Sequence, residues 1–369
     1  MSNPAIPAAH TLGEFEGRTR RMNGTVWGTV IRVVAITLAL FHLYTAGFGA
    51  LSIVKQRSMH LALVLFLIYM WFPISKKKSS RLKMTAEAAV LAFLGLGLNL
   101  YVFFRFDQIA TNSGIINRMD AIVGGLLILV VLEASRRVSG MALPLLMTIA
   151  LFYCYFGRYF PSFLRHSGMS LHRIIQYMVW STEGIYGLVL GVSSTYLFVF
   201  ILLGAILDKT GLAAVINDIA AATAGHARGG PAKVAIIASA CMGTISGSAV
   251  ANVATTGTFT IPMMKKTGYK PEFAGAVEAA ASTGGQIMPP IMGAAAFLMA
   301  EYMNIPYAQV AVKAILPALL YFTGIFIAVH LEAKKLGLKG MPKSEMVSWG
   351  ELAKRAYLII PLALLIFLV

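Results

Sequence analysis

"VAIIASACMGTISGSAVANVATTGTFTIPMM" occupies residues 234–264, and no other stretch constrains the architecture as strongly. It is apolar at both ends, rich in Gly, Ser, Thr and Asn in the middle, and flanked by Lys233 and Lys265. One straight helix of this length would measure about 50 Å, which exceeds a hydrocarbon core of roughly 30 Å. Because both flanks are basic, the stretch predicts a re-entrant helical hairpin over 232–264 that turns near residues 244–252 and leaves on the side it entered.

The composition of the whole chain points to the same environment. Of 369 residues, 58% are hydrophobic and 12% charged, about half the charged fraction of a soluble domain. Apolar runs long enough to cross a bilayer recur along most of the chain. The predicted runs are 29–51, 58–74, 84–104, 119–135, 141–157, 184–207, 308–331 and 356–369. We therefore expect an all-α polytopic membrane protein, with the lipid bilayer as its surroundings.

The net charge of +16 has an explanation in topology. The Lys and Arg residues of the chain fall in short segments between apolar runs, so the positive-inside rule explains the positive charge better than a nucleic-acid partner does. The basic segments placed in the cytoplasm are the N-terminal arm over 1–28, the cluster at Lys76, Lys77, Lys78, Arg81 and Lys83, and the pair Arg136 and Arg137. This predicts a multi-pass protein with a cytoplasmic N-terminus.

Two short amphipathic stretches are neither spans nor plain loops. Residues 171–179 and 212–219 place apolar side chains at helical spacing against a polar face, as in a helix that lies in the membrane interface. They are interpreted either as collar helices that brace a bundle or as connectors without a mechanical role.

Polar and small residues gather in the middle of the hairpin. Non-helical backbone at membrane depth is tolerated where it is buried in protein or lines a watery cavity. Hydroxyl and amide oxygens suit a cation, and the unpaired N–H groups of a helix start suit an anion. The alternative is that small residues only let two helices pack closely. The candidates here are Gly243, Ser246, Gly247, Ser248, Asn252, Thr255, Thr256 and Gly257.

The next span, residues 272–300, carries "STGGQIMPP" at 282–290. Two adjacent prolines remove two N–H donors and disfavour helix before them, so a discontinuous helix is predicted. Paired broken helices at the midplane indicate the binding site of a secondary transporter, whereas a plain proline kink is the simpler alternative. The candidates here are Ser282, Thr283, Gly284, Gly285, Gln286, Pro289 and Pro290.

Few ionisable residues fall within the predicted spans. Glu278 would bind a proton or cation if it faces a cavity; otherwise it stays near the wet inner end of its helix or pairs with a lysine. Glu87 and Glu133 are interpreted as interfacial, and His42 as an isolated histidine with a satisfied contact in the bundle. The chain has no G-x-x-x-x-G-K-[ST] loop and no H-E-x-x-H helix. We expect a transporter driven by an ion gradient rather than an enzyme, with no cofactor and no transition-metal site.

Residues 228–307, which hold the hairpin and the "STGGQIMPP" motif, resemble the large membrane subunit of tripartite ATP-independent periplasmic (TRAP) transporters. The likeness is to the fused 4TM/12TM form associated with TAXI-type binding proteins. It implies a four-helix domain like the small subunit over 29–140 and a first transport repeat over 141–335. It also implies an elevator-type importer in the bacterial inner membrane, which receives an organic acid from a periplasmic binding protein. The coupling ion that the resemblance implies is Na⁺, with H⁺ as the alternative known from TAXI systems.

The resemblance also assigns roles to the candidate residues. The cation site would comprise Ser246, Gly247, Ser248, Asn252, Ser282, Thr283, Gly284 and Gly285. The substrate cavity would comprise Thr255, Thr256, Gly257, Gln286, Pro289 and Pro290, with Glu278 as the candidate for a proton route.

One departure from the family pattern concerns the end of the chain. The family's large subunit has two inverted repeats, whereas this chain contains one and, over 336–369, a connector and the start of a second. The expectation is either that the remaining half of the large subunit lies on another chain, as a partner, or that this chain is a fragment truncated at its C-terminus. A non-transporting scaffold subunit and a passive channel are the alternatives to a permease.

Overall fold

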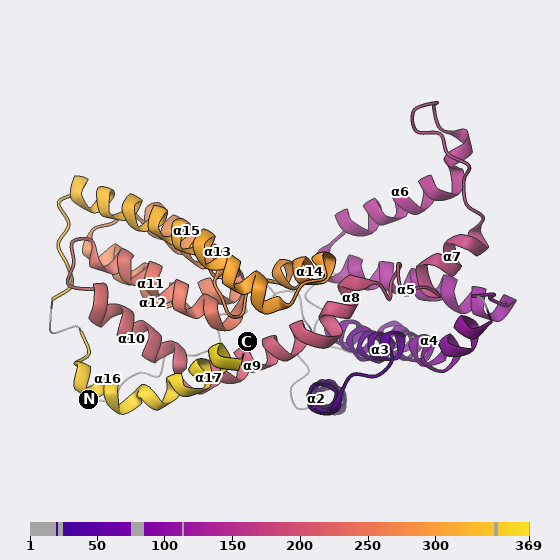
Figure 1. The fold of residues 1–369 in the computed structure, drawn as a ribbon, viewed down its shortest axis with the longest axis horizontal. Helices are drawn as coiled ribbons and strands as arrows, with labels where there is room; N and C mark the ends of the chain where they lie inside the picture. The colour runs from indigo at the N-terminus through magenta and orange to yellow at the C-terminus, as the bar shows by residue number, and fades with distance from the viewer. Residues whose placement is uncertain (1–19, 21–24, 75–84, 113, 343–345, 369) are drawn as a thin grey trace. The chain divides into compact units, whose positions relative to one another are not determined.

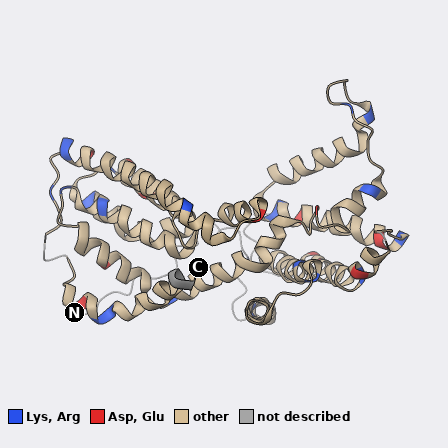
Figure 2. Ribbon diagram, viewed as in Figure 1, with Lys and Arg blue, Asp and Glu red and all other residues tan. Residues whose placement is uncertain are grey.

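A computed structural model describes residue 20 and residues 25–74, 85–112, 114–342 and 346–368. This part of the chain is built from helices and turns and contains no β-strand. Six of its helices are long and apolar enough to cross a membrane, and Figure 2 shows that Lys and Arg lie mostly near helix ends. The prediction of an all-α polytopic membrane protein is confirmed. The Lys76 to Lys83 cluster and most of the N-terminal arm lie outside the described residues.

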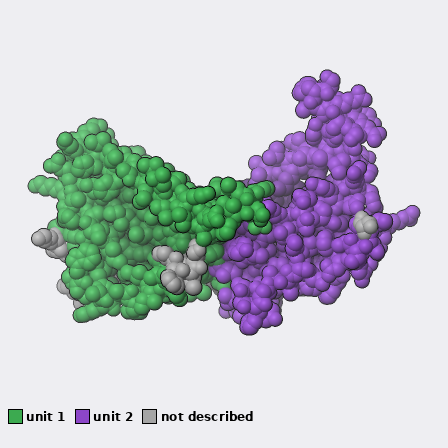
Figure 3. Space-filling model, in the orientation of Figure 1, with its two compact units in different colours: residues 1–12, 200–369 green, residues 13–199 purple. Residues whose placement is uncertain are grey.

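The chain divides into two compact units, coloured separately in Figure 3. One unit comprises residues 13–199; the other comprises residues 200–369 together with 1–12. The boundary falls inside the apolar helical stretch Leu188–Leu207. The predicted division at residue 140, between a four-helix domain and a first repeat, stays a prediction.

The 13–199 unit is a bundle around α3 and α4, which pack against each other along much of their length (Figure 1). Its helices are α2 (Val26–Phe48), α3 (Ile53–Trp71), α4 (Ala86–Thr111), α5 (Arg118–Ser139), α6 (Ala142–Phe156), α7 (Leu171–Val179) and α8 (Leu188–Val192), with a 3₁₀ turn over Gly157–Tyr159 and a π-helical turn over Ser193–Leu197.

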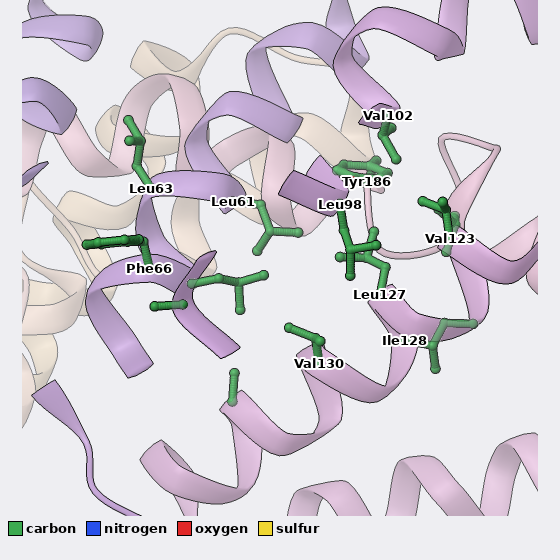
Figure 4. Close-up of a cluster of buried hydrophobic side chains, with 14 of the residues drawn as sticks. Leu61, Leu63, Phe66, Leu98, Val102, Val123, Leu127, Ile128, Val130 and Tyr186 are labelled. Atoms are coloured by element: carbon green, nitrogen blue, oxygen red, sulfur yellow. The ribbon is translucent and has the colours of Figure 1, made fainter. Parts of the chain in front are cut away.

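Buried aliphatic and aromatic side chains form the core of this bundle (Figure 4). Val102 and Leu127 are fully buried, and Tyr186 joins them while donating a hydrogen bond from its hydroxyl to Asn99 Oδ1 at 2.7 Å. Because lipid tails are as apolar as leucine, van der Waals packing and interhelical hydrogen bonds hold such helices together.

Two arginines donate hydrogen bonds to backbone carbonyls at the C-terminal end of α3. Arg20 Nη1 donates to Tyr69 O at 2.9 Å, and Arg137 Nη1 donates to Phe72 O at 3.3 Å. Cations stabilise a helix C-terminus, where carbonyl groups lack intrahelical partners. Burial lowers the pKa of the Arg20 guanidinium, and the neighbouring Arg137 lowers it further.

Arg137 also binds the two acidic residues interpreted as interfacial. Its side chain is fully buried and pairs with Glu133 at 2.8 Å and with Glu87. Arg136 pairs with Glu133 from the more exposed side at 2.7 Å. Both glutamates therefore serve an ion-pair network at the ends of α4 and α5.

Several helix boundaries differ from prediction. Helix α3 begins at Ile53 rather than residue 58, because its polar first turns find partners: Lys55 pairs with Asp107 at 2.6 Å and Arg57 donates to Tyr186 O at 2.7 Å. The predicted contact of His42 within the bundle is confirmed: its Nε2 lies 2.8 Å from Nδ1 of a second buried histidine on α3, so the residue is not isolated.

The amphipathic stretch at 171–179 forms α7 as predicted, with Ile174, Ile175 and Val179 buried and His172 and Arg173 exposed. The second such stretch forms α10 (Leu212–Ala224), five residues longer than predicted because an alanine-rich run extends it. A bracing role for either helix stays a prediction.

The 200–369 unit contains the hairpin and the broken helix. Its helices are α9 (Phe198–Lys209), which crosses the unit boundary, α10, α11 (Gly230–Ser246), α12 (Ala249–Thr267), α13 (Pro271–Gly284), α14 (Ala294–Met303), α15 (Tyr307–Lys335), α16 (Trp349–Arg355) and α17 (Ile360–Leu368), with 3₁₀ turns over Gly285–Ile287 and Ala356–Ile359. Helices α11, α12 and α13 pack against one another, and α15 packs against α11 and α13 (Figure 1). The hairpin turn falls at 247–248, within the predicted 244–252, and the helix break at 285–293 overlaps the predicted 282–290 and ends three residues later. That both hairpin ends lie on one side of a membrane stays a prediction.

Candidate functional site

A polar stripe follows one face of α12, the second arm of the hairpin. Asn252, Thr256 and Thr260 recur at every fourth position, which places them on a single helix face. All three are buried, with exposed fractions of 0 to 1%. The stripe faces Ser239 on the first arm and Glu278 on α13. Three neighbouring helices thus contribute to one buried polar cluster.

Glu278 lies at the centre of this cluster and is fully buried. Its Oε1 accepts hydrogen bonds from Ser282 at 3.0 Å, from Ser239 at 3.2 Å and from Thr256. Its Oε2 accepts one from Thr260. Neither of the two alternatives weighed for Glu278, a wet helix end or a lysine pair, is what the described residues show.

This arrangement has an electrostatic consequence. A carboxylate removed from water is costly unless a positive charge compensates it, and hydroxyl donors alone leave its net charge in place. Within the described part of the chain, no Lys or Arg forms an ion pair with Glu278. The cluster is therefore suited to take up a positive ion, either as a proton on the carboxyl or as a cation held by its oxygens.

The two threonines each have a second acceptor on their own helix. Thr256 Oγ1 lies 2.8 Å from Asn252 O, and Thr260 Oγ1 lies 3.0 Å from Thr256 O. A hydroxyl has one hydrogen, so each threonine donates either to the carboxyl of Glu278 or to its own helix. When a threonine hydroxyl stops donating to the carboxyl of Glu278, it can therefore donate to its own helix and is not left without an acceptor.

Close backbone contact brings the hairpin to the helix break. A Cβ at Gly243 would lie 2.3 Å from Gly285 Cα, so both positions require glycine for the helices to approach this closely. Asn252 Nδ2 donates to Ser239 O at 2.8 Å and fills the space beside Gly285. The Asn252 side chain therefore ties the two hairpin arms together at the level of the break.

The hairpin turn contacts the far side of the same break. Gly247 has a left-handed φ of 56°, and a Cβ there would lie 2.4 Å from Met292 O. Ile291 N donates to Thr244 O at 3.3 Å, and Gly293 N donates to Gln286 O at 2.7 Å. Backbone freed by the break is thus hydrogen-bonded within protein, as membrane depth requires.

The opposite end of the hairpin is closed by a tyrosine between α12 and α13. Tyr269 stacks on Phe273 with ring centroids 5.5 Å apart, and its hydroxyl donates to Gly229 O at 3.4 Å. Burial raises the pKa of Tyr269 to about 12, and the charge of Glu332 acts in the same direction.

The structure gathers some of the candidate residues into the cluster. Thr256 and Ser282 donate to the carboxyl of Glu278, and Asn252 joins the cluster through Thr256 and the backbone of Ser239. A Cβ at Gly257 would lie 3.1 Å from Glu278 Cγ. Ser239 and Thr260 also belong to the cluster and were missed by the sequence reasoning. Extending the four-residue spacing from Asn252 to Thr256 by one more step would have identified Thr260.

Other candidates lie apart from the carboxyl. Thr255 and Thr283 donate to carbonyls of their own helices, at 2.9 and 2.7 Å, and Ser248 caps α12 by accepting from Ala251 N. Gly284 packs against Tyr321 of α15. The remaining candidates are Ser246, which is half-buried, Gln286, which is exposed, and Pro289 and Pro290, which line an apolar pocket of about 290 Å³ beside α15. The ion-binding and substrate roles assigned to all these residues stay predictions.

The hairpin and the broken helix pack around a buried carboxyl within a polytopic membrane protein. Residues 126–369 match the family described as tripartite ATP-independent periplasmic transporter, DctM component. The chain belongs to this family.

Curated relatives carry the same family name. The C4-dicarboxylate TRAP transporter large permease protein DctM of Vibrio cholerae is 31% identical over 193 residues, which cover 52% of this chain and 40% of that protein. Its counterpart in Pseudomonas aeruginosa is 29% identical over 157 residues, covering 42% and 36%. The sialic acid TRAP transporter large permease protein SiaM of Vibrio cholerae is 26% identical over 159 residues, covering 43% and 37%. The matches thus span about two fifths of the length of these relatives.

Proposed function

We propose that this chain is part of the membrane permease of a secondary TRAP-type importer in the bacterial inner membrane. The permease would use a cation gradient to import an organic acid that a periplasmic binding protein, of the TAXI type, delivers. Family membership supports the permease, and the relatives named for C4-dicarboxylates and sialic acid support an acidic substrate. The movement would be of the elevator type, with the remainder of the large subunit completing the substrate cavity.

The observation that carries this proposal is the fully buried carboxyl of Glu278 among hydroxyl groups of three helices. A cation that binds there neutralises the carboxyl, which joins both hairpin arms to α13. Binding of the ion would therefore stabilise one arrangement of the hairpin over others, as coupling requires.

Between Na⁺ and H⁺, the contacts favour the proton. The hydroxyls of Ser239, Thr256, Thr260 and Ser282 contact the carboxyl directly. A proton on one carboxyl oxygen fits among them, because a hydroxyl oxygen can accept from it. A Na⁺ ion would have to separate these groups to reach several oxygens at once.

The ion is tested by thermal unfolding of the purified chain in lipid nanodiscs, across pH and with Na⁺ exchanged for K⁺. We expect stabilisation on acidification that is lost in Glu278→Gln and kept in Glu272→Gln, which alters an exposed glutamate at the start of the same helix. Stabilisation by Na⁺ that depends on Glu278 would assign the site to sodium. An ion response identical in wild type and Glu278→Gln would overturn the coupling role of this site.

Transport itself is tested with the complete permease and its binding protein in proteoliposomes. Uptake of a radiolabelled organic acid should require the ion gradient in the wild type and in Glu272→Gln. Gradient-independent uptake by the wild type would refute a secondary transporter of this kind.

A further inference from the structure

The 13–199 unit holds a second set of buried ionisable groups, separate from the carboxyl cluster and independent of the proposed function. His42 on α2 and His60 on α3 are 0% and 4% exposed. His42 Nε2 lies 2.8 Å from His60 Nδ1, and His60 Nε2 lies 3.2 Å from Ser193 Oγ. The fourth ring nitrogen, His42 Nδ1, is buried and makes no well-formed hydrogen bond among the described residues, and the backbone of Ser194 lies near the His42 ring.

We propose that the His42–His60 pair is a binding site for a single proton. One hydrogen already occupies the short bond between the rings. If His42 donates it, His60 Nε2–H donates to Ser193 and the lone pair of His42 Nδ1 stays free. If His60 donates it, Ser193 donates to His60 Nε2, which then holds the accessible lone pair. In either arrangement the pair has one position for one additional proton.

The protonated pair keeps its hydrogen bond. An imidazolium that donates to a neutral imidazole forms a charge-assisted hydrogen bond, which is stronger than the neutral one. The Phe198 ring lies 4.3 Å from the His42 ring, centroid to centroid, and aromatic faces stabilise a nearby cation. A second added proton would place an N–H on both facing nitrogens, His42 Nε2 and His60 Nδ1, and would break the hydrogen bond between the rings. The pair therefore accepts one added proton and disfavours the next.

The charged surroundings of the pair are sparse. On α3, Arg57 lies one turn before His60 and donates to Tyr186 O, and Lys55 is paired with Asp107. Helix α8 and the π-helical turn at Ser193 carry no charged residue, and on α2 the charged residue is Arg32, ten positions before His42. The positive charge of Arg57 disfavours each added proton, and the first added proton itself further disfavours a second one.

The site is linked to an irregular helix segment. Ser193 begins the π-helical turn, and such turns are rare and occur frequently at functional sites. Gln56 Nε2, one turn before His60, donates to Ser194 O at 2.9 Å, so α3 binds this turn through two adjacent polar contacts. With a proton on the pair, His60 Nε2–H can donate to Ser193 and the serine can no longer donate to the histidine. Proton binding therefore fixes the direction of the hydrogen bond at the turn.

The test is a titration of the full chain, with ¹⁵N-labelled histidine, in lipid bilayers by solid-state NMR. The ring nitrogens of His42 and His60 should move together in one transition between roughly pH 3 and 7. Ser193→Ala removes an acceptor and should move the midpoint to lower pH by about one unit. His172→Gln, at the exposed face of α7, should leave the transition unchanged.

Signals of His42 and His60 that stay fixed over this range would overturn the proposal. So would separate transitions in which His60→Gln leaves the titration of His42 unaltered. The wild-type titration answers the question by itself, so the test does not depend on the folding of any variant.

Discussion

Replacing Gly243 by alanine should loosen the contact between the hairpin and the helix break. The added Cβ would lie 2.3 Å from Gly285 Cα and 3.0 Å from Gly285 O, and backbone atoms cannot turn aside as a side chain can. Helix α11 would have to move away from the break, and overpacking of this kind costs about 1–3 kcal/mol. Ser239, one turn earlier on α11, would move away from Glu278 with it.

The matched control is Gly275→Ala on α13, where a new Cβ meets nothing within 4 Å. Both substitutions gain helix propensity, about 0.5–1 kcal/mol, so that gain cancels between them. The difference in free energy of unfolding should therefore equal the steric cost, about 1–3 kcal/mol against Gly243→Ala. Reversible unfolding in mixed micelles, followed by circular dichroism, measures this difference. If Gly243→Ala proves as stable as Gly275→Ala, the close contact at Gly285 is refuted.

Two further substitutions test contacts elsewhere. Thr260→Val removes a buried hydroxyl donor from the carboxyl of Glu278 and should lower the free energy of unfolding by about 1–2 kcal/mol. The control Thr258→Val alters an exposed threonine on the same helix and should change the free energy of unfolding by less than about 0.5 kcal/mol. Equal effects of the two substitutions would contradict the buried cluster. Arg137→Met leaves the carboxylates of Glu87 and Glu133 without their buried partner and should lower the free energy of unfolding by about 3 kcal/mol in denaturant titrations. Arg136→Met removes a half-exposed ion pair and should lower it by at most about 1 kcal/mol. The reverse order would show that Arg136, and not the buried Arg137, stabilises the ion-pair network.

The sequence predicts the helical architecture well because membrane depth leaves few alternatives. Basic flanks around residues 234–264 and the prolines at 289–290 place the hairpin turn and the helix break within a few residues of where they lie. Helix ends are less predictable: α3 extends through Lys55 and Arg57 because Lys55 pairs with Asp107 and Arg57 donates to the backbone carbonyl of Tyr186, both on distant segments. Such partners are not visible in local composition.

The buried cluster is only partly predictable for a related reason. Composition marks the polar middle of the hairpin but not which hydroxyls point inward, so Thr255 and Thr256 look equivalent although only Thr256 contacts the carboxyl. The spacing of four on α12 carries that information, whereas the contribution of Ser239 depends on how the two arms pack. The pairing of His42 with His60 likewise depends on the register between α2 and α3.

The double acceptors of Thr256 and Thr260 have a kinetic consequence. Each hydroxyl hydrogen moves between the carboxyl and a carbonyl of its own helix by rotation about the Cβ–Oγ bond, and no heavy atom needs to be displaced. Motions of this size are far faster than the microsecond to millisecond movements of whole helices. The local rearrangement that accompanies a change of charge at Glu278 would therefore be complete before any helix moves.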